Sequence, residues 1–388
     1  MNQSPSHYDA VIVGARAAGA STAMLLARAG LDVLVVDRSA AGSDTLSSHA
    51  LMRQAVSQLN RWGIVPALVD AGTPAIRRTV FAYPDHEVSV DIRPEGDAEG
   101  LYAPRRTVLD PILVDAARAA GAEVHHDTAL TSLVRDDAGR VHGVRLRDAA
   151  GSERTVLADI VIGADGLHSK VAREVDAPIV RRGRAANAVV MRYISGCDLA
   201  DDEYRWINRP TRLGGAIPTN DGVHCLFSSL RPTEFATARH DVESLFWESL
   251  EELDPAVADA ARGGDPAGPF RTFPGHLGQF RRPVGDGWAL VGDAGYFKDP
   301  AAAHGISDAL RDAELLADAI VDGNLAAYGS TRDRLSAGLF DALESIVDWS
   351  WTIDELPERH FHMGKAMSIE HNAVLEHFAA RHPRVAAA

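Results

Sequence analysis

Short apolar runs and amphipathic stretches alternate at the start of the chain. Residues 8–13 form an apolar run of strand length, and residues 20–29 carry small and apolar positions at helical spacing. A second apolar run, residues 32–36, ends at Asp37. The turn Gly14-Ala15-Arg16-Ala17-Ala18-Gly19 lies between the first run and the helix. This order predicts a strand, a glycine turn, a helix and a second strand, which is the unit that binds a dinucleotide.

The predicted unit supplies its ligands mainly from the backbone. The free N–H groups at a helix N-terminus hold a pyrophosphate, and a carboxylate at the end of the second strand holds the adenosine ribose. The third position of the turn is usually glycine, but here it is Arg16. Its side chain either points away from the phosphates or lies alongside them. The candidate ligands of the adenosine half are Gly14, Arg16, Ala17, Ala18, Gly19, Asp37 and Arg38.

Farther along the chain the hydrophobic residues alternate as in strands, then follow helical spacing, and then alternate again. Residues 79–83 and 88–92 read as a hairpin, residues 105–119 as a helix, and residues 129–146 as a meander. Strand signals between residues 183 and 282 are short and irregular, and the apolar strand pattern resumes at residue 287. We therefore expect an α/β fold with a discontinuous Rossmann-like domain, an inserted β-rich substrate domain and a C-terminal helical segment. The predicted boundaries are residues 1–70, 100–182 and 283–325, then 71–99 and 183–282, then 326–388.

Composition narrows the classes of function. The 388 residues include 39 basic and 54 acidic side chains, and the net charge of −15 argues against nucleic acid or an anionic membrane as a partner. Two cysteines, no apolar stretch of membrane-spanning length and no signal-peptide pattern predict a cytoplasmic protein. Neither His125-His126 nor His360-Phe361-His362 has companion ligands at zinc-like spacing, so no metal site is expected.

Three short signals follow one another along the chain: residues 14–19 with Asp37, then Gly163-Ala164-Asp165-Gly166, then Gly292-Asp293-Ala294 with Pro300 and Gly305. With these motifs in this order, the chain resembles the FAD-dependent monooxygenases built like para-hydroxybenzoate hydroxylase. That group grades into the geranylgeranyl-reductase-like dehydrogenases. The resemblance covers nearly all of residues 8–325.

The third signal also has a direct physical interpretation. A strand that ends at Asp293 can present its carboxylate to the ribityl hydroxyls, and Gly292 permits close backbone approach. The helix predicted from Ile306 can stabilise negative charge at the pyrimidine edge of the reduced flavin. By resemblance, Arg106 reaches the FAD phosphates or ribityl chain, the Leu130 backbone contacts adenine, and the middle motif contacts FAD. The further candidate cofactor ligands are Ser48, Arg106, Leu130, Asp165, Gly166, Gly292, Asp293, Pro300, Gly305, Ile306 and Ser307.

Few side chains are expected to take part in the chemistry, because the flavin itself transfers electrons. His49 and His304 are the candidate catalytic residues, each able to supply or relay a proton. The alternative is that His304 is a capping or surface histidine, and His49 likewise has a structural role as its alternative.

The chain carries a single dinucleotide fingerprint, so NAD(P)H is expected to bind only transiently over the FAD. This favours a monooxygenase in which molecular oxygen forms a flavin C4a-hydroperoxide that hydroxylates or epoxidises a small aromatic or polyketide-like molecule. The alternatives are a dehydrogenase or reductase that acts on a C–C bond without oxygen incorporation, and a non-enzymatic FAD-binding protein. The sequence does not predict the oligomeric state.

Two further patterns bear on the substrate. Trp349-Ser350-Trp351-Thr352-Ile353 is similar to a signature of flavin-dependent halogenases, but Asp354 follows it and no lysine precedes Lys170. We therefore expect these tryptophans to be packing residues rather than part of a halogenation site. Four arginines in the predicted insertion are compatible with an acidic substrate, but equally with ordinary surface arginines: Arg192, Arg205, Arg209 and Arg212.

Overall fold

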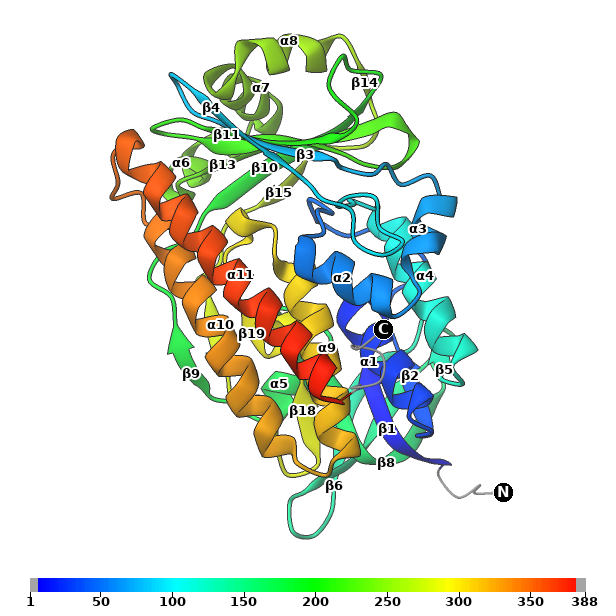
Figure 1. Cartoon of the computed structure of the whole chain (residues 1–388). Helices are drawn as coiled ribbons and strands as arrows, with labels where there is room; N and C mark the ends of the chain where they lie inside the picture. Colours follow the sequence, from blue (N-terminus) through cyan, green and yellow to red (C-terminus); the bar gives the residue numbers. More distant parts are fainter. Residues whose placement is uncertain (1–5, 382–388) are drawn as a thin grey trace.

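The structure is a computed structural model that describes residues 6–381. Two eight-stranded sheets occupy opposite ends of the molecule, and the C-terminal helices run along one side of both (Figure 1). The ends of the predicted segments, residues 1–5 and 382–388, lie outside the described residues.

The first sheet carries the predicted nucleotide-binding unit. Its order is β17-β18-β8-β1-β2-β5, with β6 and β7 attached to β8 as an antiparallel meander. Pairing is parallel from β18 through β8, β1 and β2 to β5. The strands are β1 (Ser6–Val13), β2 (Val33–Val36), β5 (Glu123–His125), β6 (Ala129–Arg135), β7 (Val141–Arg147), β8 (Glu153–Gly163), β17 (Val284–Gly285) and β18 (Trp288–Leu290).

Alternate side chains of this sheet serve two different cores. Ala10 and Ile12 face a core shared with the helices, whereas Val11 and Val13 face the meander and α5. This alternation follows from the period of two along a strand, and it buries the sheet on both faces. The helices of this part are α1 (Ala17–Arg28), α2 (Arg53–Arg61), α3 (Val65–Asp70), α4 (Arg106–Ala119), α5 (Lys170–Glu174) and α9 (Gly305–Val321).

The second sheet joins the early hairpin to the later insertion. Its order is β14-β10-β13-β12-β11-β3-β4, and β15 also pairs with β10. β3 of the hairpin pairs in parallel with β11, so segments far apart in sequence form one sheet. The strands are β3 (Arg78–Ala82), β4 (Glu87–Asp91), β10 (Ala188–Ser195), β11 (Glu203–Asn208), β12 (Leu213–Pro218), β13 (Val223–Leu230), β14 (Asp265–Pro266) and β15 (Arg271–Phe273).

Three helices that the sequence analysis did not predict belong to the insertion: α6 (Pro232–Ala238), α7 (Val242–Leu253) and α8 (Pro255–Arg262). Phe246 and Leu250 of α7 pack on the outer face of the second sheet. The helix starts are marked by Asp241, whose carboxylate accepts the Ser244 N–H at 3.0 Å, and by Asp254 with Pro255 directly after it. The insertion is therefore a sheet with helices over its outer face.

The remaining elements connect the two sheets and cover them. A small sheet contains β9 (Ile179–Arg182), β16 (Gln279–Arg281) and β19 (Tyr296–Phe297). The C-terminal segment contains α10 (Leu325–Val347), η4 (Ile353–Glu355) and α11 (Leu356–Arg381), which extends past both sheets (Figure 1). The short 3-10 helices are η1 (Asn220–Gly222), η2 (Gly292–Ala294) and η3 (Pro300–Ala302).

Candidate functional site

The turn after β1 is built so tightly that it requires glycine at both ends. Gly14 has a φ of 110°, and a Cβ there would lie 2.4 Å from the Ala164 carbonyl oxygen. A Cβ at Gly19 would lie 1.8 Å from the Gly14 carbonyl oxygen. Real Cβ atoms do not approach other atoms this closely, so either substitution would force the turn open. The close contact brings the start of α1 against the end of β8.

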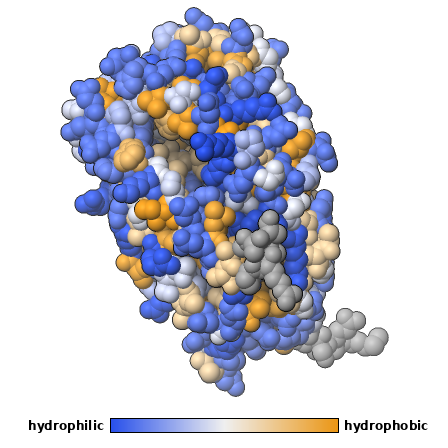
Figure 2. Space-filling model, viewed as in Figure 1, coloured by the Kyte–Doolittle hydropathy of each residue, from blue (hydrophilic) through white to orange (hydrophobic). Residues whose placement is uncertain are grey.

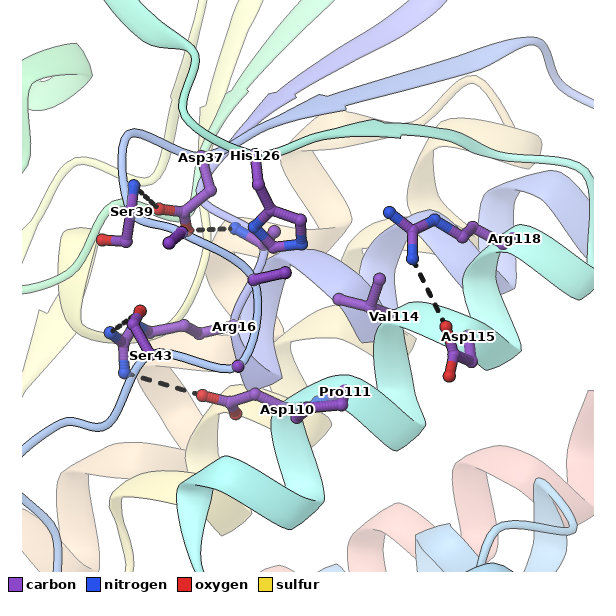
Figure 3. A pocket seen from close by; sticks show the side chains of 14 residues that line it. Arg16, Asp37, Ser39, Ser43, Asp110, Pro111, Val114, Asp115, Arg118 and His126 are labelled. Atoms are coloured by element: carbon purple, nitrogen blue, oxygen red, sulfur yellow. Dashed lines mark hydrogen bonds and ion pairs between the residues drawn. The ribbon is translucent and has the colours of Figure 1, made fainter. Parts of the chain in front are cut away.

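A cavity of about 400 Å³, measured out to open solvent, opens beside this turn, and Arg16, Asp37 and Asp110 line it (Figure 3). The Asp37 carboxylate accepts the N–H groups of Ala15 and Ser39, each at 2.8 Å. These two bonds hold the carboxylate in place at the carboxyl end of β2. The sequence-predicted ribose ligand and the phosphate-binding turn therefore face the same cavity.

The Arg16 side chain lies along this cavity. One of its terminal nitrogens, Nη1, is 3.6 Å from Asp110 Oδ2, and the other, Nη2, donates to Ser43 Oγ at 3.3 Å (Figure 3). Arg106 binds the second oxygen of Asp110, with its Nε donating at 2.9 Å. Burial raises the pKa of Asp110, and the two guanidinium groups oppose this rise. Asp110 thus holds two cationic side chains at one end of the site.

The predicted strand that ends at Asp293 is shorter than expected: β18 ends at Leu290, and Asp293 lies in η2. The Asp293 carboxylate has no hydrogen-bond or ion-pair partner among residues 6–381. Burial raises its pKa to about 6, while the charges of Lys298 and Arg106 pull it down. Arg106 therefore acts on carboxylates in both parts of the site, by contact on Asp110 and through space on Asp293. α9 begins at Gly305, which is exposed and has open space where a Cβ would stand.

A second cavity of about 710 Å³, measured out to open solvent, lies between the second sheet and the C-terminal helices. The aromatic side chains of Phe81, Trp206 and Phe227 line it from the sheet. His360 and Met363 line it from α11, and η3 contributes two alanines to its wall. In Figure 2 the surface is hollowed below the second sheet, with apolar residues inside the hollow. Because η3 directly precedes the start of α9, this cavity adjoins the third motif.

A family model for the FAD binding domain matches residues 7–325. The chain belongs to this FAD-binding family. It is an FAD-dependent oxidoreductase, in agreement with the resemblance based on the three motifs.

Curated relatives of this flavoprotein are named as reductases. The chain is 27% identical to the digeranylgeranylglycerophospholipid reductase of Methanosarcina mazei over 369 residues, which cover 89% of this chain and 80% of the relative. It is also 27% identical to the menaquinone reductase of Mycolicibacterium smegmatis, with coverage of 83% and 78%.

Solved structures with the same fold include halogenases and a probable monooxygenase. The flavin-dependent brominase Bmp2 matches with a TM-score of 0.78 at 18% identity, covering 97% of this chain and 100% of that chain. PqsL from Pseudomonas aeruginosa, a probable FAD-dependent monooxygenase, matches with a TM-score of 0.71 at 20% identity, covering 94% and 100%. At these identities the likeness establishes the fold alone.

The residues present fit FAD. The glycine turn leaves room for a pyrophosphate at the start of α1, and Asp37 faces the same cavity. The partner-free carboxylate of Asp293 can accept hydrogen bonds from ribityl hydroxyls, and the N-terminal amides of α9 can hold an anionic edge. Bound FAD would supply the electron transfer, and the protein would orient the flavin and exclude water.

His49 is fully buried rather than open to either cavity. Its Nε2 lies 2.6 Å from the Tyr193 hydroxyl, and the two rings stack with centroids 5.3 Å apart. Burial lowers the pKa of His49 well below its usual value, and the charges of Arg105 and Arg106 add to this effect. The ring is therefore neutral, and its catalytic role remains a prediction.

His304 is buried at the N-cap of α9, and its Nε2 lies 3.7 Å from Glu370 Oε2 of α11. Burial lowers its pKa. His304, Asp308 and Glu370 bring three potential metal-ligating atoms within 4.8 Å. Lys298 already pairs with Asp308, and Arg311 pairs with Asp308 and with Glu370 Oε1, whereas Glu370 Oε2 has no hydrogen-bond partner among the described residues. The proton-relay role of His304 also remains a prediction.

Residues of the middle motif form hydrogen bonds that stabilise the start of α5. Asp165 accepts the Ser169 hydroxyl at 2.5 Å and the Lys170 N–H at 2.6 Å, so its carboxylate caps α5. The Leu130 carbonyl accepts the Lys170 ammonium at 3.1 Å. The cofactor contacts predicted for Asp165, Gly166 and Leu130 remain predictions.

The other predicted cofactor ligands differ in accessibility. Arg38 and Pro300 are exposed, and Ser48 is partly exposed. Four lie buried in the helices and turns of the site: Ala17, Gly292, Ile306 and Ser307. Ala18 is partly buried, and its Cβ would lie 3.0 Å from a Cβ built at Gly292, so α1 and η2 are in close contact. The two outer motifs therefore meet in space, as one cofactor site requires.

Sequence reasoning missed a set of polar residues between the cofactor site and the second sheet. Asp44 accepts from Arg105 at 3.2 Å and from Arg271 at 2.8 Å. The Arg105 guanidinium also lies 4.1 Å from the centroid of the Tyr193 ring. No motif marks these residues, because they come from four separate segments. Asp110 was detectable, since it follows Arg106 by one helical turn.

Within the part of the chain that the structure describes, no helix has the length and apolarity to cross a membrane.

Proposed function

We propose that this chain is an NAD(P)H-dependent monooxygenase that hydroxylates or epoxidises a small, aromatic or polyketide-like organic molecule. The observation that carries the proposal is the second cavity, whose wall includes Ala301 and Ala302 just before α9. A substrate in this cavity would lie next to the end of the site where the flavin ring is expected. The lining is mostly apolar, and such a lining protects reactive oxygen chemistry from water.

The way the electron donor binds follows from the architecture. Among the described residues, β1, the Gly14 turn, α1 and β2 form the single unit of the dinucleotide-binding type that we identify. NAD(P)H would then bind transiently and leave before oxygen reacts. Small-molecule substrate, molecular oxygen and nicotinamide would thus use one flavin in turn.

The curated relatives favour a second candidate reaction. The curated relatives from Methanosarcina mazei and Mycolicibacterium smegmatis are named as reductases, and the chain covers about four fifths of each. A reductase that acts on a C–C bond of an apolar molecule is therefore the second candidate. Both reactions need the same cofactor and an apolar cavity, but only one incorporates oxygen.

The test begins with anaerobic mixing of the holoprotein with NADPH and, separately, with NADH. Loss of the flavin absorbance, faster when a phenolic or polyketide compound is present, is expected for the monooxygenase. Reoxidation with isotopically labelled dioxygen should then place the label in the organic product. Reduction of the substrate without label would favour the reductase. If neither donor bleaches the flavin under any condition, this would count against both reactions with NAD(P)H as the electron donor.

A further inference from the structure

The second cavity has no charged wall. Among the described residues that line it, none is Asp, Glu, Lys or Arg. Two arginines of the insertion are paired elsewhere: Arg205 pairs with Glu87 at 2.6 Å, and Arg212 pairs with Glu252 at 3.3 Å. A carboxylate that entered the cavity would lose its water without gaining a counter-ion, which is strongly unfavourable. The cavity therefore favours an uncharged molecule.

The sheet side of the cavity is an aromatic floor. Phe81, Trp206 and Phe227 come from β3, β11 and β13. They form one cross-strand row of paired residues, with Gly215 of β12 between the last two. Trp206 and Phe227 meet edge to face, with ring centroids 5.8 Å apart. Gly215 contributes no side chain to this row, which leaves space above the sheet at that point. Such a surface suits a flat or ring-bearing apolar molecule.

The opposite wall carries one polar ring. His360, Met363 and Met367 occur three and four residues apart on α11, which places them on one face of the helix. His360 Nδ1 lies 2.8 Å from the Tyr83 hydroxyl. Its other nitrogen, Nε2, has no hydrogen-bond partner among residues 6–381, and the ring lines the cavity.

The His360 ring is unprotonated, and therefore neutral, in buffers near pH 7. Burial lowers the pKa of His360 to about 4 and raises that of Tyr83 to about 12. A neutral imidazole whose Nδ1 is engaged by a hydroxyl offers Nε2 as a donor or an acceptor, depending on the tautomer. The flexible methionines beside it adapt to different apolar shapes.

We infer that His360 is a specificity-determining residue that hydrogen-bonds a hydroxyl or carbonyl of an otherwise apolar, uncharged substrate, while Tyr83 orients its ring. The inference rests on the proposed function only in taking this cavity as the place of the substrate. The preferred substrate is then a neutral ring-bearing alcohol, phenol or ketone, and its acidic analogues are excluded.

Binding of simple probes to the oxidised holoprotein, without nicotinamide, tests the inference. The probes are 2-naphthol, naphthalene and 2-naphthoate, and equilibrium dialysis gives their dissociation constants. We expect 2-naphthol to bind at least about tenfold more tightly than 2-naphthoate and several-fold more tightly than naphthalene. His360→Leu should remove the preference for 2-naphthol over naphthalene, whereas His360→Gln should retain most of it.

His362→Leu is the matched control, because His362 is exposed on the same helix. It should leave all three constants unchanged. If His360→Leu does not fold, Tyr83→Phe replaces it and should weaken only 2-naphthol binding.

Three results would overturn the inference. They are binding of 2-naphthoate as tightly as 2-naphthol, no measurable binding of 2-naphthol, and a naphthol preference that survives His360→Leu. In the last case, loss of the preference in Ser229→Ala would assign the hydrogen bond to the cavity's sheet wall instead. None of these measurements needs turnover. A failure here therefore differs from a failure of the labelled-oxygen experiment, which bears on the proposed function alone.

Discussion

Arg16 and Asp110 form an ion pair of 3.6 Å across the cavity beside the glycine turn. Arg16 stands at the third position of the turn, which is usually glycine, and Asp110 lies one helical turn after Arg106 on α4. The pair fixes the Arg16 side chain along the cavity wall (Figure 3). The sequence left open whether this side chain points away from the phosphates, and in the structure it lies along the cavity that Asp37 also lines.

Replacing Arg16 should therefore weaken FAD binding. A charged hydrogen bond to a phosphate contributes about 1.5–3 kcal/mol, so Arg16→Gln should raise the FAD dissociation constant by about tenfold to a hundredfold. The constant should also depend less on salt, because one cation is lost. Titration of the apoprotein, followed by flavin fluorescence, measures both effects. Arg147→Gln, at an exposed arginine, is the control, and equal affinities in the two variants would mean that Arg16 does not touch the phosphates.

Asp37 should be required for tight FAD binding but not for folding. Asp37→Ala removes the predicted ribose contact, so we expect about a tenfold to hundredfold rise in the dissociation constant. It also removes the acceptor of the Ala15 and Ser39 N–H groups, which loosens the turn. Circular dichroism should confirm that the variant is folded. Asp137→Ala, at an exposed loop position, should bind FAD like the parent chain, and similar binding by Asp37→Ala would contradict the assignment.

Arg311 should be the most costly arginine to remove. It is fully buried and pairs with Asp308 at 3.1 Å, with Asp312 at 2.7 Å and with Glu370 of α11. Arg311→Met leaves three carboxylates without their shared cation, so we expect a loss of about 3–5 kcal/mol in the free energy of unfolding.

Urea unfolding at saturating FAD measures this loss. Arg334→Met, at an exposed position of α10, should change the free energy of unfolding by less than about 0.5 kcal/mol. A similarly small change in Arg311→Met would show that α11 is not held to α9 by this cluster.

His360 should make the protein less stable in acid. Its pKa is about 4 in the folded state and about 6.5 in the unfolded chain, so the unfolded chain binds the proton first as the pH falls. The contribution of His360 is complete above about pH 6.5 and is lost as the pH falls towards about 4.

Because the ring is only partly buried, the expected loss between about pH 7 and about pH 4.5 is about 1–2 kcal/mol. Urea unfolding at both pH values should show a shallower decline for His360→Gln than for the parent chain. His362→Gln should follow the parent. An identical decline in His360→Gln would mean that the imidazole is already charged or freely hydrated in the folded protein.

Candidate residues of the cofactor site could be identified from the sequence where they lie close together in it. Gly14, Gly19 and Asp37 belong to one strand, turn, helix and strand, and the backbone alone brings them together. Asp293 was a candidate from its motif, but it lies in η2, three residues beyond the end of the buried strand β18. The helices α6–α8 were missed although Asp241 and Asp254 mark their starts, because the insertion was interpreted from its strands alone.

The sequence by itself determined the cofactor, the class of fold and the position of Asp37 directly after β2, whereas it did not predict that Asp293 lies in η2, beyond the end of β18. Only the tertiary structure decided which side chains meet across separate segments. Tyr83 of the early hairpin reaches His360 of the last helix, 277 positions away in the chain. The cavity that His360 lines has no Asp, Glu, Lys or Arg among its described lining residues, and Arg205 and Arg212 pair with other side chains. Periodicity and motifs report contacts within one element, whereas these contacts depend on how the sheet and the C-terminal helices pack.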